Sequence, residues 1–145
     1  MLQFEQEIQE YNKLHNTYAC VLSCGMPFYQ IIASEISRIQ KQHEHSLILL
    51  INCEKRARAI EMHANFKIVQ LTSDLMTQRR ANTYFTGGVL CTSIRTLAID
   101  LLSLRLSPTL INGIFIILSR QLLDVGTYLP MIFDTYLRGN KDVYR

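Results

Sequence analysis

The sequence predicts an α/β domain in which helices cover both faces of a mainly parallel sheet. Short apolar runs of strand length alternate with longer segments whose apolar residues recur at helical spacing. Residues 46–52 and 114–118 are apolar at successive positions, which is typical of strands that are buried on both faces. Because parallel strands need a crossover between them, this alternation favours a layered α/β domain.

Each expected element has a local signal. The first helix, residues 1–14, places Phe4, Ile8 and Tyr11 on one face. Ser73 and Asp74 offer an N-cap to a helix that reaches Tyr84, and Gly87-Gly88 then breaks the pattern. The other expected helices cover residues 28–39, 54–64, 93–104 and 124–138, the last kinked or delimited by Pro130. Strands are expected at residues 18–23, 46–52, 67–71 (the weakest), 89–92 and 114–118.

Composition narrows the class of protein but leaves its function open. The 145 residues suit one domain with one core, and no apolar run approaches the roughly 20 residues that span a bilayer. We therefore expect no membrane association. The acidic start lacks the features of a secretory signal, and the four cysteines lie in or at the ends of apolar segments, which favours an intracellular protein with free thiols. A net charge of +3 permits contact with phosphate without requiring it.

The turn after the first expected strand lacks the groups that bind a triphosphate. A working P-loop needs several glycines, a lysine for the β- and γ-phosphates and a hydroxyl for Mg²⁺. This turn offers one glycine, no lysine, and a proline without an N–H group. We therefore interpret it as a degenerate P-loop, made of Ser23, Cys24, Gly25, Met26, Pro27 and Phe28.

Residues 84–102, YFTGGVLCTSIRTLAIDLL, resemble a stretch of the XPF-type structure-specific DNA-repair endonucleases, Y-x-x-G-G-[VI]-x(5)-R-x-L-x-[VI]-D-[FL]-L. Residues 106–114, LSPTLINGI, are similar to the lead of that family into its helicase motif II strand. The likeness keeps its register and extends over essentially the whole chain. It implies that residues 1–145 form one three-layer RecA-like lobe, the N-terminal fragment of a longer nuclease.

The same register places two apolar residues where an active helicase carries its metal-binding and water-orienting acids. These positions are Ile117 and Leu118, followed by Ser119 and Arg120. Apolar side chains hold neither a divalent cation nor an attacking water. We therefore expect no ATPase activity and no cofactor. The second lobe, the nuclease domain with its E-R-K-x-x-x-D motif, and the tandem helix-hairpin-helix module of the family are not in this sequence.

Polar groups follow two of the expected strands and are the candidates for contacts with DNA. Because the C-terminal ends of parallel strands share one sheet edge, they are expected to lie together and to touch the sugar-phosphate backbone, as the resemblance implies. The candidates are Lys55, Arg56 and Arg58 after the second strand, and Thr92, Ser93 and Arg95 after the fourth. The alternative is that the first three form an ordinary solvated helix face near Glu54 and Glu61.

Other groups of side chains give little evidence for a metal site or a catalytic nucleophile. Cys20 and Cys24 with His43 and His45 lack the spacing of a zinc site, and Cys91, Ser93 and Ser119 have no histidine and acid in a recognisable pattern. We expect no metal site and no catalytic nucleophile.

Two functions remain after this reading. The first is a non-catalytic scaffold in a nuclear DNA-repair endonuclease, active in nucleotide excision repair and junction processing. It would contact branched DNA and repair proteins, including the smaller nuclease subunit of the family through a C-terminal region not present here. The second is a stand-alone adaptor that binds only protein. The missing lysine and acids argue against a third, an ATP-dependent helicase lobe.

Overall fold

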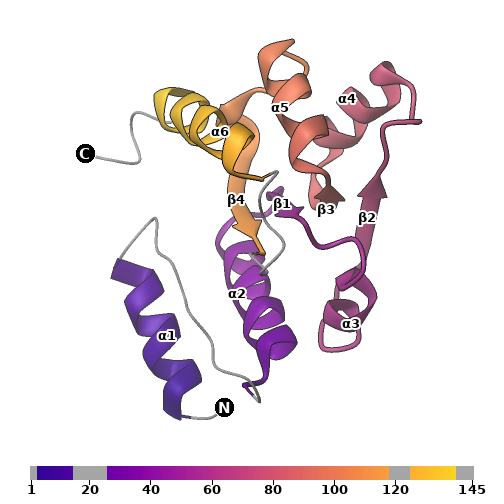
Figure 1. The fold of residues 1–145 in the computed structure, drawn as a ribbon. Helices are drawn as coiled ribbons and strands as arrows, with labels where there is room; N and C mark the ends of the chain where they lie inside the picture. The colour runs from indigo at the N-terminus through magenta and orange to yellow at the C-terminus, as the bar shows by residue number, and fades with distance from the viewer. Residues whose placement is uncertain (1–2, 15–25, 118–124, 140–145) are drawn as a thin grey trace.

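The computed structural model describes residues 3–14, 26–117 and 125–139, and the expected strand at 18–23 lies outside them. It holds six α-helices, one 3-10 turn and four strands in these described residues (Figure 1). The helices are α1 (Gln3–Leu14), α2 (Phe28–Gln42), α3 (Ala57–Glu61), α4 (Thr77–Thr86), α5 (Ile94–Leu102) and α6 (Val125–Gly139). The strands are β1 (Leu47–Ile51), β2 (Ile68–Leu71), β3 (Gly88–Thr92) and β4 (Ile111–Ile116), the last preceded by the 3-10 turn η1 (Pro108–Leu110).

The four strands form one parallel sheet in the order β2-β3-β1-β4. β1 lies inside the sheet, and all five of its residues are buried. Its register runs from Leu47 opposite Gly88 to Ile51 opposite Thr92, so β1 and β3 start and end side by side. This all-parallel sheet confirms the expected α/β class.

Helices cover both faces of the sheet, which gives the three-layer arrangement expected of a RecA-like domain (Figure 1). Side chains alternate along β1: Ile48 and Leu50 point to the face covered by α2 and α3, whereas Leu49 and Ile51 point to the face covered by α4, α5 and α6. A strand with apolar side chains at every position is stable only where both faces are dry. The apolar run at 46–52 therefore encodes the central position of β1.

A double-glycine turn sets the register of β3 against β1. Gly87 and Gly88 have φ values of +83° and +100°, in the region that favours glycine. The Gly88 amide donates to the Ser46 carbonyl over 2.9 Å, and a Cβ on Gly87 would lie only 3.2 Å from that same oxygen. Both glycines of the family-like stretch are therefore needed to end α4 and start β3 beside β1.

A buried carboxylate joins α4 to α5. Asp100 is 0% exposed and accepts two hydrogen bonds from Arg80, over 3.0 and 2.9 Å, and one from the Tyr84 hydroxyl over 2.7 Å. Arg80 also donates to the Leu75 carbonyl, and Arg105 approaches Asp100 to 3.7 Å. Tyr84 and Asp100 of the family-like stretch therefore form a hydrogen bond that holds α4 against α5.

The environment of this cluster shifts the pKa values of its members. Burial alone would raise the pKa of Asp100, but hydrogen bonds from Arg80 and Tyr84 and the nearby positive charges hold it below its ordinary value. Burial and the bond to Asp100 raise the pKa of Tyr84, and the same carboxylate raises that of Arg80. The stable state of the cluster is an ionised Asp100 beside a charged Arg80 and a neutral tyrosine.

Several predicted boundaries were wrong, each for a local reason. The helix expected at 54–64 covers only Ala57–Glu61, because residues 53–56 form a turn in which the Cys53 carbonyl accepts from Arg56 and Ala57. The helix expected to be capped by Ser73 or Asp74 begins at Thr77 without a side-chain cap.

The last strand and the last helix also differ from the expectation. β4 begins at Ile111 rather than Ile114, because a bulge lets the Asn112 side chain accept from the Leu47 amide and extends the pairing. Pro130 lies inside α6 rather than limiting it.

Removing the carboxylate of Asp100 should destabilise the domain strongly. Asp100→Ala leaves the Arg80 charge buried without its partner, so we expect a loss of about 3–5 kcal/mol in the free energy of unfolding. Tyr84→Phe removes one hydrogen bond and should cost about 1–1.5 kcal/mol. Urea unfolding measures both, with Asp134→Ala, which breaks the exposed Asp134–Arg138 pair, as the control that stays within about 0.5 kcal/mol. Equal losses in Asp100→Ala and the control would contradict the role of the cluster.

The same cluster should make stability depend on pH. Because the folded pKa of Asp100 lies below the unfolded one, its contribution is complete above the ordinary carboxyl pKa of about 3.9 and is lost as pH falls through the folded value. Urea midpoints of the parent and of Asp100→Asn should therefore converge as pH falls from 7 to 3. A gap of constant size over this range would show that ionised Asp100 does not stabilise the fold.

Candidate nucleic-acid interface

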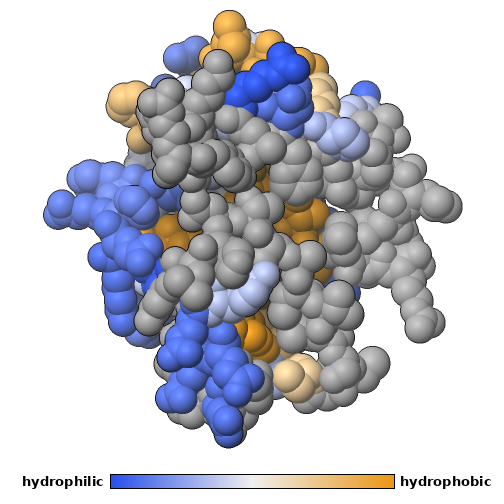
Figure 2. Space-filling view, turned by 90° about the vertical axis from the view of Figure 1, so that its left-hand side faces the viewer, coloured by the Kyte–Doolittle hydropathy of each residue, from blue (hydrophilic) through white to orange (hydrophobic). Residues whose placement is uncertain are grey.

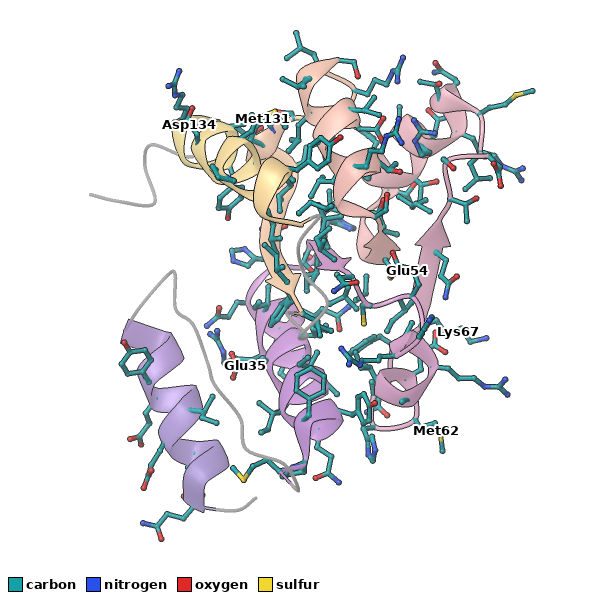
Figure 3. The ribbon with its side chains drawn as sticks, in the orientation of Figure 1. Glu35, Glu54, Met62, Lys67, Met131 and Asp134 are labelled. Carbon is teal, nitrogen blue, oxygen red and sulfur yellow. The ribbon has the colours of Figure 1, made fainter. Side chains whose placement is uncertain are left out.

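The two predicted cation-bearing segments meet at one edge of the sheet. Since Ile51 lies opposite Thr92, the residues that follow β1 and β3 leave the sheet as neighbours. Asn52, with φ of +59°, turns the chain after β1, and its side-chain amide donates to the Ile117 carbonyl over 2.8 Å. The ends of β3, β1 and β4 are thus fixed beside one another, and Figure 3 draws Glu54, which follows β1, near the tip of the β3 arrow.

Four cationic residues stand in the segments that leave this edge, which we call the cation edge: Lys55 and Arg56 after β1, Arg58 in α3 and Arg95 in α5. Arg56 is half-buried and the other three are exposed. None of the four forms an ion pair or a side-chain hydrogen bond within residues 3–14, 26–117 and 125–139. Cations without an ion-pair partner are available to an approaching anion.

The alternative for these cations was a face solvated together with Glu54 and Glu61. Glu61 faces elsewhere, because its carboxylate accepts from the Ile68 amide over 2.6 Å and ties α3 to β2. Glu54 is exposed, and its backbone carbonyl accepts from Gln70. Glu61 is thus engaged by β2, whereas Glu54 stands in the same segment as Lys55 and Arg56.

The predicted polar groups after β3 have different environments. Ser93 caps α5: its Oγ accepts from the Thr96 amide over 3.1 Å and donates to the Thr96 hydroxyl over 2.9 Å. Thr92 is only 1% exposed, and its hydroxyl oxygen has no hydrogen-bond partner. The cap thus satisfies the Thr96 amide, while the Ile94 and Arg95 amides in the first turn of α5 have no intrahelical acceptor.

The degenerate P-loop lies partly outside the described residues, which include Met26, Pro27 and Phe28 but not Ser23, Cys24 or Gly25. α2 begins at Phe28, with Pro27 at the N-cap position and no side-chain cap. Phe28 packs against the apolar core under α2. The start of this helix therefore offers an apolar ring and a residue without an N–H group.

The motif II position is a core position. Ile117 is 5% exposed, belongs to the apolar cluster under α2 and α3, and donates its amide to the Ile51 carbonyl over 3.1 Å. Leu118, Ser119 and Arg120 lie outside the described residues. Ile117, which the resemblance places where an active helicase carries an acid, thus contributes apolar packing.

Two buried thiols were not predicted to be partners. Cys53 follows β1, Cys91 lies in β3, and both are free. Their hydrogen bond lowers the pKa of Cys53 and, together with burial, raises that of Cys91. The pairing of β1 with β3 brings them together, and no spacing in the sequence signals it. In the described residues no three metal-ligating side chains gather, and no helix has the length and apolarity that a bilayer span needs.

The chain is similar to one DNA repair protein. It is 27% identical over 128 residues to the DNA repair protein rad16 of Schizosaccharomyces pombe, a match that covers 84% of this chain. The chain spans only 14% of the length of that relative. No protein-family model and no solved structure matches it.

Mg-ATP should leave the thermal stability of the domain unchanged. Bound ligand at 100 times its dissociation constant would stabilise the folded state by about 2.7 kcal/mol, which a melting curve detects easily. We expect no shift in Tm at millimolar Mg-ATP, because Pro27 has no N–H group to offer a phosphate and Ile117 is an apolar core residue that cannot bind a metal. Mg-ADP and MgCl₂ alone serve as controls. A concentration-dependent rise in Tm with Mg-ATP only would contradict this expectation.

Proposed function

We propose that the chain is the non-catalytic, helicase-like lobe of an XPF-type DNA-repair endonuclease. It contacts the sugar-phosphate backbone of branched or junction DNA through the cation edge and offers surfaces to repair proteins. The observation that supports the DNA role is the pairing of β1 with β3, which makes the segments that carry the four cations leave the sheet as neighbours. The similarity to rad16 supports the link to DNA repair.

The chemistry of the cation edge favours phosphate over bases. Guanidinium groups and the free amides at the start of α5 bind anionic oxygens without reading a sequence. Thr92 contributes through its place in the strand, since its side chain is buried, and Ser93 contributes by capping α5. The lobe thus holds DNA in position, while cutting belongs to a nuclease domain outside this chain.

A scaffold without ATP hydrolysis is consistent with the core role of Ile117 and with the start of α2 at Phe28. In this proposal the parent protein works in the nucleus in nucleotide excision repair and junction processing. It pairs with the smaller nuclease subunit of the family through its C-terminal region.

A second function, a protein-docking adaptor without a nucleic-acid role, is favoured by a different observation. Large apolar side chains are exposed on α5 and just after it, away from the cation edge. The two functions differ in what the cations do, so a measurement of DNA binding separates them.

DNA binding should be weak, independent of sequence and steeply dependent on salt. If about four cations engage phosphate, affinity should fall about 100-fold between 50 and 200 mM salt, with a log–log slope of about −3 to −4. Arg56→Ala with Arg95→Ala should reduce that slope by about 2 without changing any preference among base sequences. Fluorescence anisotropy with forked and duplex oligonucleotides measures both quantities.

The matched control removes the same charge elsewhere. Lys41→Ala with Arg138→Ala takes one cation from the last turn of α2 and one from the last turn of α6, and should keep the parental slope. If the Arg56/Arg95 variant binds like the parent, or if nothing binds at 50 mM salt, the DNA role fails and the adaptor becomes the better account.

A further inference from the structure

One face of α5 is exposed and largely apolar. Arg95, Ile99 and Leu102 follow one another at helical spacing and are all exposed, with Ile99 at 46% and Leu102 at 65%. Residues 96–98, 100 and 101 between them are all buried. The helix therefore presents a stripe of two large aliphatic side chains to the outside, although its buried face already anchors it to the sheet.

Leu104 extends this stripe beyond the end of α5. It has a φ of +58°, in the left-handed region where leucine is strained, and its side chain is 86% exposed. Figure 2 shows strongly hydrophobic surface at the top of the molecule, the level at which Figure 1 draws the end of α5. This conformation ends α5, because it lets the Arg105 and Leu106 amides donate to the Asp100 carbonyl, and it leaves the Leu104 side chain exposed.

Positive charge stands at both ends of this apolar stripe. Arg95 lies one turn before Ile99 and has no partner in the described part of the chain. Arg105 follows Leu104, and its contact with Asp100 is 3.7 Å long, because Arg80 already makes both short bonds to that carboxylate. Arg80, Asp100 and Arg105 together carry a net charge of +1. The half-exposed Arg105 guanidinium is the accessible group of the three.

We infer that the α5 stripe, formed by Ile99, Leu102 and Leu104 between Arg95 and Arg105, docks an amphipathic helix of a partner protein. That helix carries an aliphatic face with acidic residues at both ends. Aliphatic side chains spaced by three residues offer the ridges into which a second helix packs, and the two arginines select for acidic flanks. The inference deepens the protein-docking part of the proposed function, and it shares Arg95 with the proposed DNA contact.

The test uses two synthetic helices of roughly fourteen residues that share one leucine face. One has glutamate at both ends and the other has lysine. Isothermal titration of the full 145-residue chain at low salt should show binding of the glutamate peptide, and binding of the lysine peptide should be about tenfold weaker or absent. Arg105→Glu should narrow or reverse that difference.

Two double variants assign the binding to the stripe. Ile99→Ser with Leu102→Ser should weaken the glutamate peptide more than tenfold, because it removes the apolar area that the peptide covers. Met62→Ser with Met76→Ser, which alters two equally exposed methionines elsewhere, should leave it unchanged. All four substitutions are at exposed positions, so the variants should keep the parental Tm.

The outcomes separate this inference from the DNA role. Equal affinity for both peptides, no binding of either, or full affinity in the Ile99/Leu102 variant overturns it. Concentration-dependent dimers in sedimentation that the Ile99/Leu102 variant abolishes also overturn it, because the occupant is then a second copy of this chain. The Ile99/Leu102 variant alters no cation and should keep parental affinity for forked DNA, so a parent chain that binds no DNA at 50 mM salt leaves the peptide result intact.

Discussion

The arrangement of the second helical layer depends on one buried carboxylate. Asp100 binds Arg80 and Tyr84, which stand one turn apart on α4, so a single acid fixes both the distance and the rotation between α4 and α5. A buried ion in this position leaves little freedom, because any shift of either helix strands a charge in an apolar layer. The start of α5 at the cation edge inherits its position from this bond.

The candidate interface is a product of topology more than of any motif. Lys55 and Arg95 are 40 positions apart in the chain, yet the parallel pairing of β1 with β3 brings the segments that carry them to one edge. The Gly87-Gly88 turn sets that pairing at the start of the strands, and Asn52 secures it at their ends. Within the stretch that resembles the repair nucleases, Gly87 and Gly88 thus help to build the edge. Arg95 of the same stretch is exposed at this edge and has no ion-pair partner in the described residues.

The sequence predicts the alternation of strands and helices well, because buried parallel strands leave an unbroken apolar run such as 46–52. It predicts helix starts poorly: Ser73 and Asp74 have the chemistry of caps, but the chain stays in a turn until Thr77. The sequence could not predict the bond between Arg80 and Asp100, since it joins two helices and its residues are 20 positions apart in the chain. Only the i, i+4 spacing of Arg80 and Tyr84, on the face that turned out to be buried, hinted at it.

α5 connects the cation edge to the α5 stripe as one continuous helix, Ile94–Leu102. Its first turn stands at the cation edge, while Leu102 lies about 10 Å further along its axis, a distance comparable with the Debye length of about 8 Å at physiological ionic strength. Acidic groups held over the first turn of α5 would make the electrostatic potential that phosphate meets there less positive, without any movement of the backbone. An acidic partner held on the α5 stripe would therefore weaken anion binding at the cation edge through the field alone.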